Sequence, residues 1–342
     1  MKEELKKIAK NVVNNGSDIL RSETEKLREN AIEIIDKRID KKKWSGYDSI
    51  PSGIAEDTVV PGCLVLEGGS FRGLYTSGVL DVFMENGINI QTTIGTSAGA
   101  LNGYNYVAGE IGRSAKINLG YRHDIRYMGP VSAYQSRGVV GLNFIINEIE
   151  SDLPFNHERF NDPKRRFLVT VTNCETGQCV YCEKGVTPEF NKAVQASASM
   201  PYVSNMVDVD GMPCLDGGCT VKIPYQWAID NGYEKILVIK TRPQGFRHPK
   251  EENDLANTAE VLYRNYPLLN ETLKRQNIDY NHALDELDKL ESEGRLMTMA
   301  PSGSIQVSHL EGDMEKLGAL YLLGRCDAML MLPKVKAYFG IE

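Results

Sequence analysis

The stretch TTIGTSAGA, residues 92–100, decides the fold, because it joins a short β-strand candidate to the start of a helix through one tight turn. Its centre, GTSAG (95–99), matches the pattern G-x-S-x-G. Gly95 and Gly99 remove side chains that would clash in a sharp strand-to-helix turn, so the Ser97 hydroxyl is held exposed. The helix that follows directs free N–H groups at the same place. The stretch therefore predicts a nucleophilic serine, with a plain tight turn as the alternative.

Apolar runs and helix-periodic segments alternate along the chain on both sides of this turn. Strands are expected over 63–67, 92–95, 167–182 (two strands joined by a turn), 235–243 and 304–313, and helices over 74–86, from 98 onward, 191–199, 253–295 and 314–323. Strands that alternate with helices imply a sheet covered on both faces. The sequence thus predicts an α/β protein with three α/β/α layers and a mainly parallel central sheet.

Composition narrows the class of protein. The chain has 342 residues, of which 42% are apolar and 25% charged, which argues against a disordered, fibrous or disulfide-framework protein. The net charge of −7 disfavours a nucleic-acid partner for the chain as a whole. No run approaches the roughly 18 apolar residues of a membrane span, and the first residues contain no apolar signal segment. The seven cysteines are therefore expected to be reduced thiols of a cytoplasmic protein.

A glycine-rich loop, EGGSFRG (67–73), follows the first strand candidate some 25 residues before Ser97. Consecutive small residues let backbone N–H groups converge on an anion. The loop lacks the Gly-Lys-Ser/Thr of a phosphate-binding Walker loop, and its glycines do not fit the dinucleotide pattern. A developing oxyanion is therefore favoured over a bound nucleotide, and a structural turn is the alternative.

A third motif, PCLDGG (213–218), places Asp216 before two glycines. A serine hydroxyl needs a base before it becomes a good nucleophile. Asp216 is suited to that task if burial or a neighbour raises its pKa above the usual value of about 3.9. From this motif alone, an Asp-Gly hairpin turn is the favoured interpretation.

Taken in this order, the three motifs resemble those of the patatin-like phospholipase family. The similarity extends from about Val65 to Asn231 and includes ASASMPYVS (196–204) before the aspartate and VKIPYQWAIDNG (221–232) after it. The segments LEGGSFRGLYTSGVLD and RYMGPVSAYQSRG are similar to those of bacterial members.

The resemblance implies a function and a set of site residues. Ser97 corresponds to the nucleophile and Asp216 to its partner in a dyad without histidine. The backbone N–H groups of Gly68, Gly69 and Ser70 correspond to the oxyanion hole. Arg72 matches the family's basic position, where it would contact an anion or headgroup. The remaining motif glycines are Gly73, Gly95, Gly99, Gly217 and Gly218. The implied activity is hydrolysis of a lipid carboxylic ester, as in a phospholipase A, lysophospholipase or esterase, through an acyl-enzyme and without metal or cofactor.

One residue departs from the family pattern, because Ser70 stands where a third glycine is usual. If that position needs a positive φ, serine strains it by roughly 1–3 kcal/mol. This departure motivates a second hypothesis, a lipid- or partner-binding module with little turnover. A third interpretation is an α/β-hydrolase esterase, because Ser97, Asp216 and His309 follow the order of its triad. An ordinary loop histidine is favoured for His309.

Two further features bear on organisation. Residues 1–60 are expected to form an N-terminal extension, with two basic, amphipathic helices up to about residue 43 and a linker over 44–62. The hydrolase domain is expected over 61–342, with the motif core at 63–231 and a C-terminal α/β portion at 232–342. The helix pair is interpreted as a solvated face, with peripheral membrane contact or homo-oligomer formation as the alternatives. Cys179 and Cys182 alone have metal-ligand spacing, and no metal site is predicted.

Overall fold

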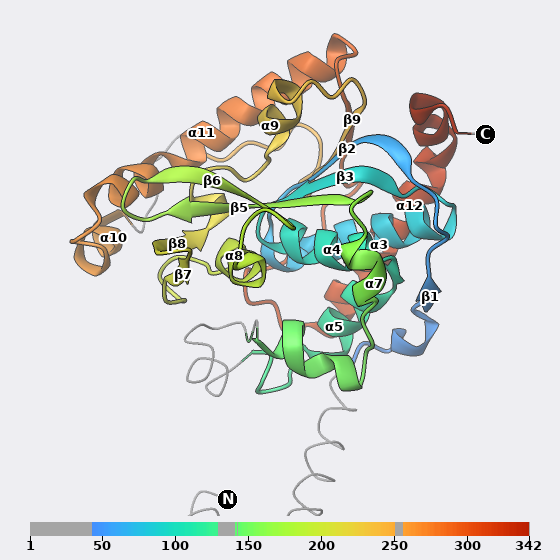
Figure 1. Ribbon diagram of the computed structural model, residues 1–342, viewed down its shortest axis with the longest axis horizontal. Helices are drawn as coiled ribbons and strands as arrows, with labels where there is room; N and C mark the ends of the chain where they lie inside the picture. Colours follow the sequence, from blue (N-terminus) through green and yellow to red (C-terminus); the bar gives the residue numbers. More distant parts are fainter. Residues whose placement is uncertain (1–42, 129–140, 142, 250–255, 342) are drawn as a thin grey trace, which may run out of the picture. The chain divides into compact units, whose positions relative to one another are not determined.

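One mainly parallel sheet organises this computed structural model, which describes residues 43–128, 141, 143–249 and 256–341 (Figure 1). The strands lie in the order β10 (Met297–Met299), β9 (Ile236–Ile239), β2 (Val60–Leu66), β3 (Ile90–Gly95), β5 (Arg166–Asn173), β8 (Met212–Asp216) and β7 (Val207–Val209), and β6 (Gln178–Glu183) also pairs with β5. The strands from β10 to β5 pair in parallel, whereas β6, β7 and β8 add antiparallel pairs. The predicted mainly parallel sheet is confirmed.

Helices cover both faces of this sheet (Figure 1). On one face lie α3 (Gly73–Glu85), α4 (Ala98–Val107), α5 (Arg113–Tyr121), α7 (His157–Asn161), α8 (Phe190–Ser197) and α12 (Met314–Phe339), and on the other α9 (Tyr225–Asp230), α10 (Ala256–Leu262) and α11 (Pro267–Ser292). Short elements complete the described part: η1 (Tyr47–Ser49), η2 (Ser70–Arg72), η3 (Phe144–Glu148), η4 (Ile149–Ser151), η5 (Gly217–Cys219), and a small antiparallel sheet of β1 (Gly53–Ile54) and β4 (Glu110–Ile111).

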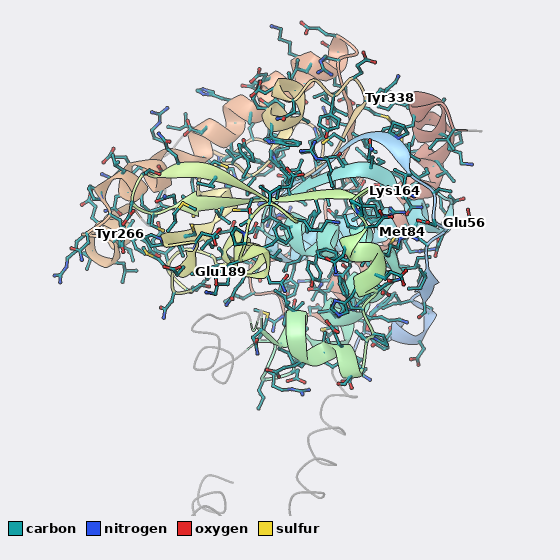
Figure 2. All side chains as sticks on the ribbon, in the orientation of Figure 1. Glu56, Met84, Lys164, Glu189, Tyr266 and Tyr338 are labelled. Carbon is teal, nitrogen blue, oxygen red and sulfur yellow. The ribbon has the colours of Figure 1, made fainter. Side chains whose placement is uncertain are left out.

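The alternation of side chains along β2 explains why both faces need a cover. Leu64 and Leu66 belong to the apolar core shared with α3, α4 and α12, whereas Cys63 and Val65 pack into the core under α9 and α11. Because successive side chains of a strand point to opposite faces, an apolar run requires helices on both sides. Met84 on α3 is buried, whereas Lys164, which Figure 2 also labels, is exposed. The predicted α/β/α layering is confirmed.

The sheet register brings the ends of β3 and β8 together. β3 runs parallel to β5 and ends at Gly95, which pairs with Val169. β8 runs antiparallel to β5 and ends at Asp216, which pairs with Val171. Since β6 pairs along the other edge of β5, β3 and β8 share one edge and approach each other end to end. Two residues of a strand span about 7 Å, so the residues that follow Gly95 lie close to Asp216.

Two expectations from the sequence are wrong. The segment 44–62, predicted to be a linker, packs against the domain: Trp44, Ile50 and Ala55 are buried in the main core, and Trp44 contacts the Tyr321 ring. Gly53 lies in β1, and Pro61 and Gly62 lie in β2, so these residues belong to strands rather than to a linker. The segment 304–313 is not a strand, and β10 precedes it at Met297–Met299. The helices expected in residues 1–42 lie outside the described residues.

Candidate active site

Ser97 occupies a sharp turn between β3 and α4. Its backbone has φ +55° and ψ −121°, a conformation that residues with a side chain rarely adopt. The flanking glycines make the turn possible, because a Cβ on Gly95 would lie 2.5 Å from the carbonyl oxygen of Gly99. A Cβ on Gly99 would lie 2.4 Å from the carbonyl oxygen of Leu66. A strained backbone of this kind is typical of a nucleophilic serine in the turn that follows a strand of the sheet.

The Ser97 hydroxyl donates a hydrogen bond to Asp216. The distance from Ser97 Oγ to Asp216 Oδ2 is 2.6 Å, although the residues are 119 apart in sequence. Both are buried, with 8% and 5% of their surfaces exposed. The second carboxylate oxygen, Asp216 Oδ1, accepts from the Gly218 amide at 2.7 Å. This pair of bonds fixes the carboxylate and leaves one oxygen directed at the serine.

The surroundings of Asp216 make its carboxylate a stronger base than usual. Burial raises the pKa of Asp216 to about 6, while the hydrogen bonds from Ser97 and the Gly218 amide and the charge of Lys222 oppose that rise. The carboxylate is therefore mostly ionised at pH 7 and accepts a proton more readily than an exposed aspartate.

The glycine-rich loop lies beside Ser97, and it supplies fewer amides than the sequence suggests. A Cβ on Gly68 would lie 3.2 Å from the Ser97 Cβ. The Gly68 amide, however, donates to the Lys222 carbonyl at 3.0 Å, so Gly68 is not an available oxyanion donor in this structure. Within the described part of the chain, the amides of Gly69 and Ser70 donate to no protein acceptor. The prediction for Gly68 is therefore corrected, and two candidate donors remain.

The strain predicted at Ser70 is present, because its φ is +49°. Gly73 closes the same loop, and its carbonyl accepts from Asn102 Nδ2 on α4 at 2.8 Å. A Cβ on Gly73 would lie 2.8 Å from the Ala98 Cβ, so close packing requires glycine there. The loop is thus fastened directly to the helix that starts after Ser97.

Gly217 and Gly218 follow Asp216 in η5. A Cβ on Gly217 would lie 2.1 Å from the Thr170 hydroxyl, which itself bonds Thr96 at 2.7 Å. The two glycines therefore let the chain turn tightly over β5 immediately after the carboxylate.

Arg72 does not line the pocket beside Ser97. Its Nε is buried without a hydrogen-bond partner among the described residues. Burial lowers the pKa of Arg72, and the charge of Arg242 lowers it further, whereas Glu67 opposes the shift. The expected headgroup contact of Arg72 is therefore not a contact with this pocket.

His309 does not complete a Ser-Asp-His triad. Its Nδ1 lies 3.1 Å from Ser70 Oγ. Ser97 bonds Asp216 directly, so no imidazole stands between them. This geometry contradicts the α/β-hydrolase alternative.

An apolar pocket with a volume of about 70 Å³ opens at Ser97. Its lining comprises Ser70, Phe71, Gly73, Leu74, Ser97, Ala98, Leu101, Asn102, Asn105, Ser114, Ile117, Asn118, Tyr127, Met128, Ile145, Ala198, Met200 and His309. Most of these side chains are apolar, so the pocket suits a hydrocarbon group next to a nucleophile.

Sequence reasoning missed several supporting residues. The Ser97 amide donates to Ser197 Oγ at 3.0 Å, and Lys222 lies close enough to Asp216 to influence its pKa. Behind the loop, buried Glu67 accepts from the Tyr280 hydroxyl and from the Thr241 amide. Ser197 falls within the flanking segment 196–204, but no spacing rule singles it out.

Over the described ranges, no group of three His, Cys, Asp or Glu side chains is arranged to hold a metal ion. The seven cysteines form no disulfides. None of the helices in those ranges combines the length and apolar character that crossing a bilayer requires.

Comparison with known proteins places this geometry in a family. The profile of the patatin-like phospholipases matches residues 64–229, the part that contains both Ser97 and Asp216. This part of the chain belongs to the patatin-like phospholipase family. The predicted resemblance is confirmed. Residues 266–340 match a domain of unknown function, DUF6363.

Relatives of the patatin-like domain include the uncharacterized protein YjjU of Escherichia coli K12, 28% identical over 53% of this chain and 52% of that protein. The uncharacterized NTE family protein Rv1063c of Mycobacterium tuberculosis H37Rv is 26% identical over 47% of this chain and 43% of that protein. The chain thus matches about half the length of these relatives. VipD from Legionella pneumophila aligns with a TM-score of 0.42 and 13% identity over 80% of this chain and 67% of its own.

Proposed function

We propose that this chain is a serine acyl hydrolase that cleaves carboxylic ester bonds of lipids, with Ser97 as nucleophile and Asp216 as general base. The observation that carries the proposal is the 2.6 Å hydrogen bond from Ser97 Oγ to the buried Asp216 carboxylate at the end of an apolar pocket. A hydroxyl paired with a base of raised pKa is the arrangement that nucleophilic catalysis needs.

The mechanism follows from these positions. Ser97 Oγ attacks the ester carbonyl carbon while its proton passes to Asp216 Oδ2. The oxyanion that forms accepts hydrogen bonds from the Gly69 and Ser70 amides, near the positive end of α4. Collapse of the tetrahedral intermediate expels the alcohol, which takes the proton from Asp216, and leaves the acyl group on Ser97.

In deacylation, water is the nucleophile and Ser97 is the leaving group. Water attacks the acyl carbon and gives its proton to Asp216. The second tetrahedral intermediate collapses, Ser97 recovers that proton, and the free acid leaves. Each turnover therefore consumes one water and returns both side chains to their starting state.

The test is labelling with a fluorophosphonate together with hydrolysis of an ester panel that includes phospholipid, lysophospholipid and neutral esters. The unaltered chain is expected to be labelled at Ser97 and to hydrolyse at least one ester class. Ser97→Ala should abolish both signals, whereas Ser70→Ala, a matched serine in the same pocket, should retain labelling. Hydrolysis that persists in Ser97→Ala removes Ser97 from the mechanism.

A second candidate is a lipid-binding module with little turnover. The strained Ser70 and the occupied Gly68 amide favour it, because both weaken the set of oxyanion donors. Binding to liposomes without labelling at Ser97 would support this module over the enzyme. A cytoplasmic location with peripheral membrane contact remains a prediction under either function.

A further inference from the structure

We infer that the C-terminal part of the chain supports the active site, because Tyr280 on α11 holds Glu67 and thereby the glycine-rich loop in place. Tyr280 lies within residues 266–340, the part that matches a domain of unknown function. It does not line the pocket beside Ser97, so it acts as a positioning residue. The inference deepens the proposed function and rests on it for the role of the loop in ester hydrolysis.

Glu67 connects α11 to the loop through a buried carboxylate. It is the first residue after β2, and it is 1% exposed. One of its carboxylate oxygens accepts from the Tyr280 hydroxyl and the other from the Thr241 amide. Burial raises the pKa of Tyr280, and the charge of Glu67 raises it further, so the hydroxyl keeps the proton that it donates. A carboxylate that accepts from two fixed donors has a defined orientation.

The Thr241 side chain carries this constraint to the loop. Its hydroxyl donates a long hydrogen bond of 3.4 Å to the Gly68 carbonyl. It also packs against Gly69, where a Cβ would lie 2.6 Å from the Thr241 hydroxyl oxygen. The Gly68 carbonyl and the Gly69 N–H belong to one planar trans peptide, in which they point in opposite directions. The bond to the carbonyl therefore directs the Gly69 N–H away from Thr241.

Other backbone groups of the loop are also engaged. The Gly68 amide donates to the Lys222 carbonyl, and the Gly69 carbonyl accepts from the Arg72 amide, each at 3.0 Å. Among the residues that the structure describes, no protein acceptor takes the N–H of Gly69 or of Ser70. Two donors that are held in place and left without an acceptor suit an oxyanion, because no reorganisation is needed during the reaction.

The Tyr280 hydroxyl keeps Glu67 from turning toward nearby positive charges. Burial lowers the pKa of Arg72 and of Lys222, and the charge of Glu67 opposes both shifts. The ammonium nitrogen of Lys222 also lies 4.9 Å from the centre of the Tyr280 ring. A buried carboxylate that loses a donor is costly until it finds another partner. Without the hydroxyl, we expect Glu67 to turn toward these cations and to release the Thr241 amide.

The first experiment compares Tyr280→Phe with Tyr225→Phe by hydrolysis of p-nitrophenyl butyrate. Tyr225 is a matched control, because its hydroxyl donates at 2.7 Å to Glu286, another α11 residue, rather than to the loop. For Tyr280→Phe we expect kcat to fall about tenfold to a hundredfold while KM stays within about twofold, since misdirected donors weaken binding of the transition state alone. Tyr225→Phe should keep both constants. An unchanged kcat in Tyr280→Phe, or an equal loss in Tyr225→Phe, overturns the inference.

Inhibition by butylboronic acid separates positioning of the loop from general damage to the fold. The boronic acid forms a tetrahedral adduct with Ser97 that resembles the reaction intermediate. Its inhibition constant for Tyr280→Phe should therefore rise by about the factor by which kcat falls. The melting temperature should fall no further than in Tyr225→Phe, which also loses one hydroxyl. An inhibition constant that stays unchanged while kcat falls contradicts the assigned role.

Glu67→Gln is the second variant, and it also serves if Tyr280→Phe does not fold. It should lower kcat by a similar factor, again with little change in KM. The variant that combines both substitutions should lose no more than Glu67→Gln alone, because both act through one carboxylate. Losses that multiply would show that Tyr280 and Glu67 act independently, and they would overturn the inference.

Hydrogen exchange of a peptide over residues 67–72, measured by mass spectrometry, tests the loop without using activity. The Gly68 and Arg72 amides are hydrogen-bonded there, and Tyr280→Phe should speed their exchange by about tenfold, whereas Tyr225→Phe should not. Unchanged exchange in Tyr280→Phe overturns the inference. If the unaltered chain hydrolyses no ester but this difference is found, the proposed hydrolase fails while the support of the loop by α11 stands.

Discussion

The hydroxyl of Ser70 and the imidazole of His309 lie 3.1 Å apart, from Oγ to Nδ1, beside a nucleophile candidate that takes no part in this contact. Partial burial and the nearby charges of Arg72, Lys222 and Arg242 lower the pKa of His309. The ring is therefore neutral at pH 7, and its position lets it support the strained loop rather than relay a proton for Ser97.

His309→Ala should lower kcat/KM of ester hydrolysis by only about twofold to tenfold, the size expected for one lost neutral hydrogen bond. Steady-state kinetics at pH 7.5 measures this change, with Ser97→Ala as the inactive reference. A loss of three orders of magnitude in kcat/KM would instead show that His309 transfers a proton, and it would support the α/β-hydrolase mechanism.

Ser70→Gly should relieve the backbone strain at φ +49° but also remove the contact with His309. We expect the relief to exceed the loss and to stabilise the folded chain by roughly 1 kcal/mol. Activity should stay within about threefold of the unaltered chain, because the residue-70 amide survives the change. Thermal melting and kinetics check both parts. A large loss of activity would show that the serine side chain itself takes part in catalysis.

The pH dependence of kcat/KM should follow the ionisation of Asp216. Because the base must be ionised, activity should fall about tenfold per pH unit below the Asp216 pKa of about 6. The positive charge of Lys222 holds that pKa down, so Lys222→Met should move the acid limb to higher pH. Lys289→Met, an exposed control on α11, should leave the limb unmoved. A limb that stays near the usual aspartate pKa of about 3.9 contradicts Asp216 as the base.

Local pattern in the sequence predicts much of the fold and part of the site. The strand, turn and helix around Ser97 depend on residues adjacent in sequence, and β3 and α4 lie where they were expected. Where apolar periodicity is clear, as in α3 and α8, the helix bounds agree within two residues. The segment 304–313 alternates apolar and polar residues like a strand, but no neighbouring strand pairs with it.

Contacts between residues far apart in the sequence leave no local pattern from which they could be predicted. Ser97 and Asp216 were related through family resemblance, whereas their meeting depends on β3 and β8 sharing one edge of β5. The hydrogen bond from the Gly68 amide to the Lys222 carbonyl also joins residues far apart in the sequence, and neither motif contains a pattern that predicts it. The glycines and prolines of 44–62 predict a linker, and nothing near Trp44 in the sequence points to its partner Tyr321, which lies near the other end of the chain.

The buried carboxylate of Asp216 should cost stability while it serves catalysis. Its pKa in the folded chain is about 6, above the ordinary value of 3.8, so folding favours the protonated form. The stabilising effect of protonation is present at low pH and is lost as the pH rises through about 6. At pH 7 the ionised group then destabilises the fold by up to about 3 kcal/mol. Asp216→Asn keeps the shape and removes the charge.

Asp216→Asn should therefore raise the melting temperature by a few degrees at pH 7, although it abolishes ester hydrolysis. At pH 4 the gain should vanish, because the Asp216 carboxyl is then protonated in the folded chain and carries no buried charge. Differential scanning calorimetry at the two pH values measures the difference, with the exposed Glu234→Gln as the matched control. A variant that is less stable than the unaltered chain at pH 7 would show that the ionised carboxylate, through its bonds to Ser97 and Gly218, stabilises the turn more than its burial costs.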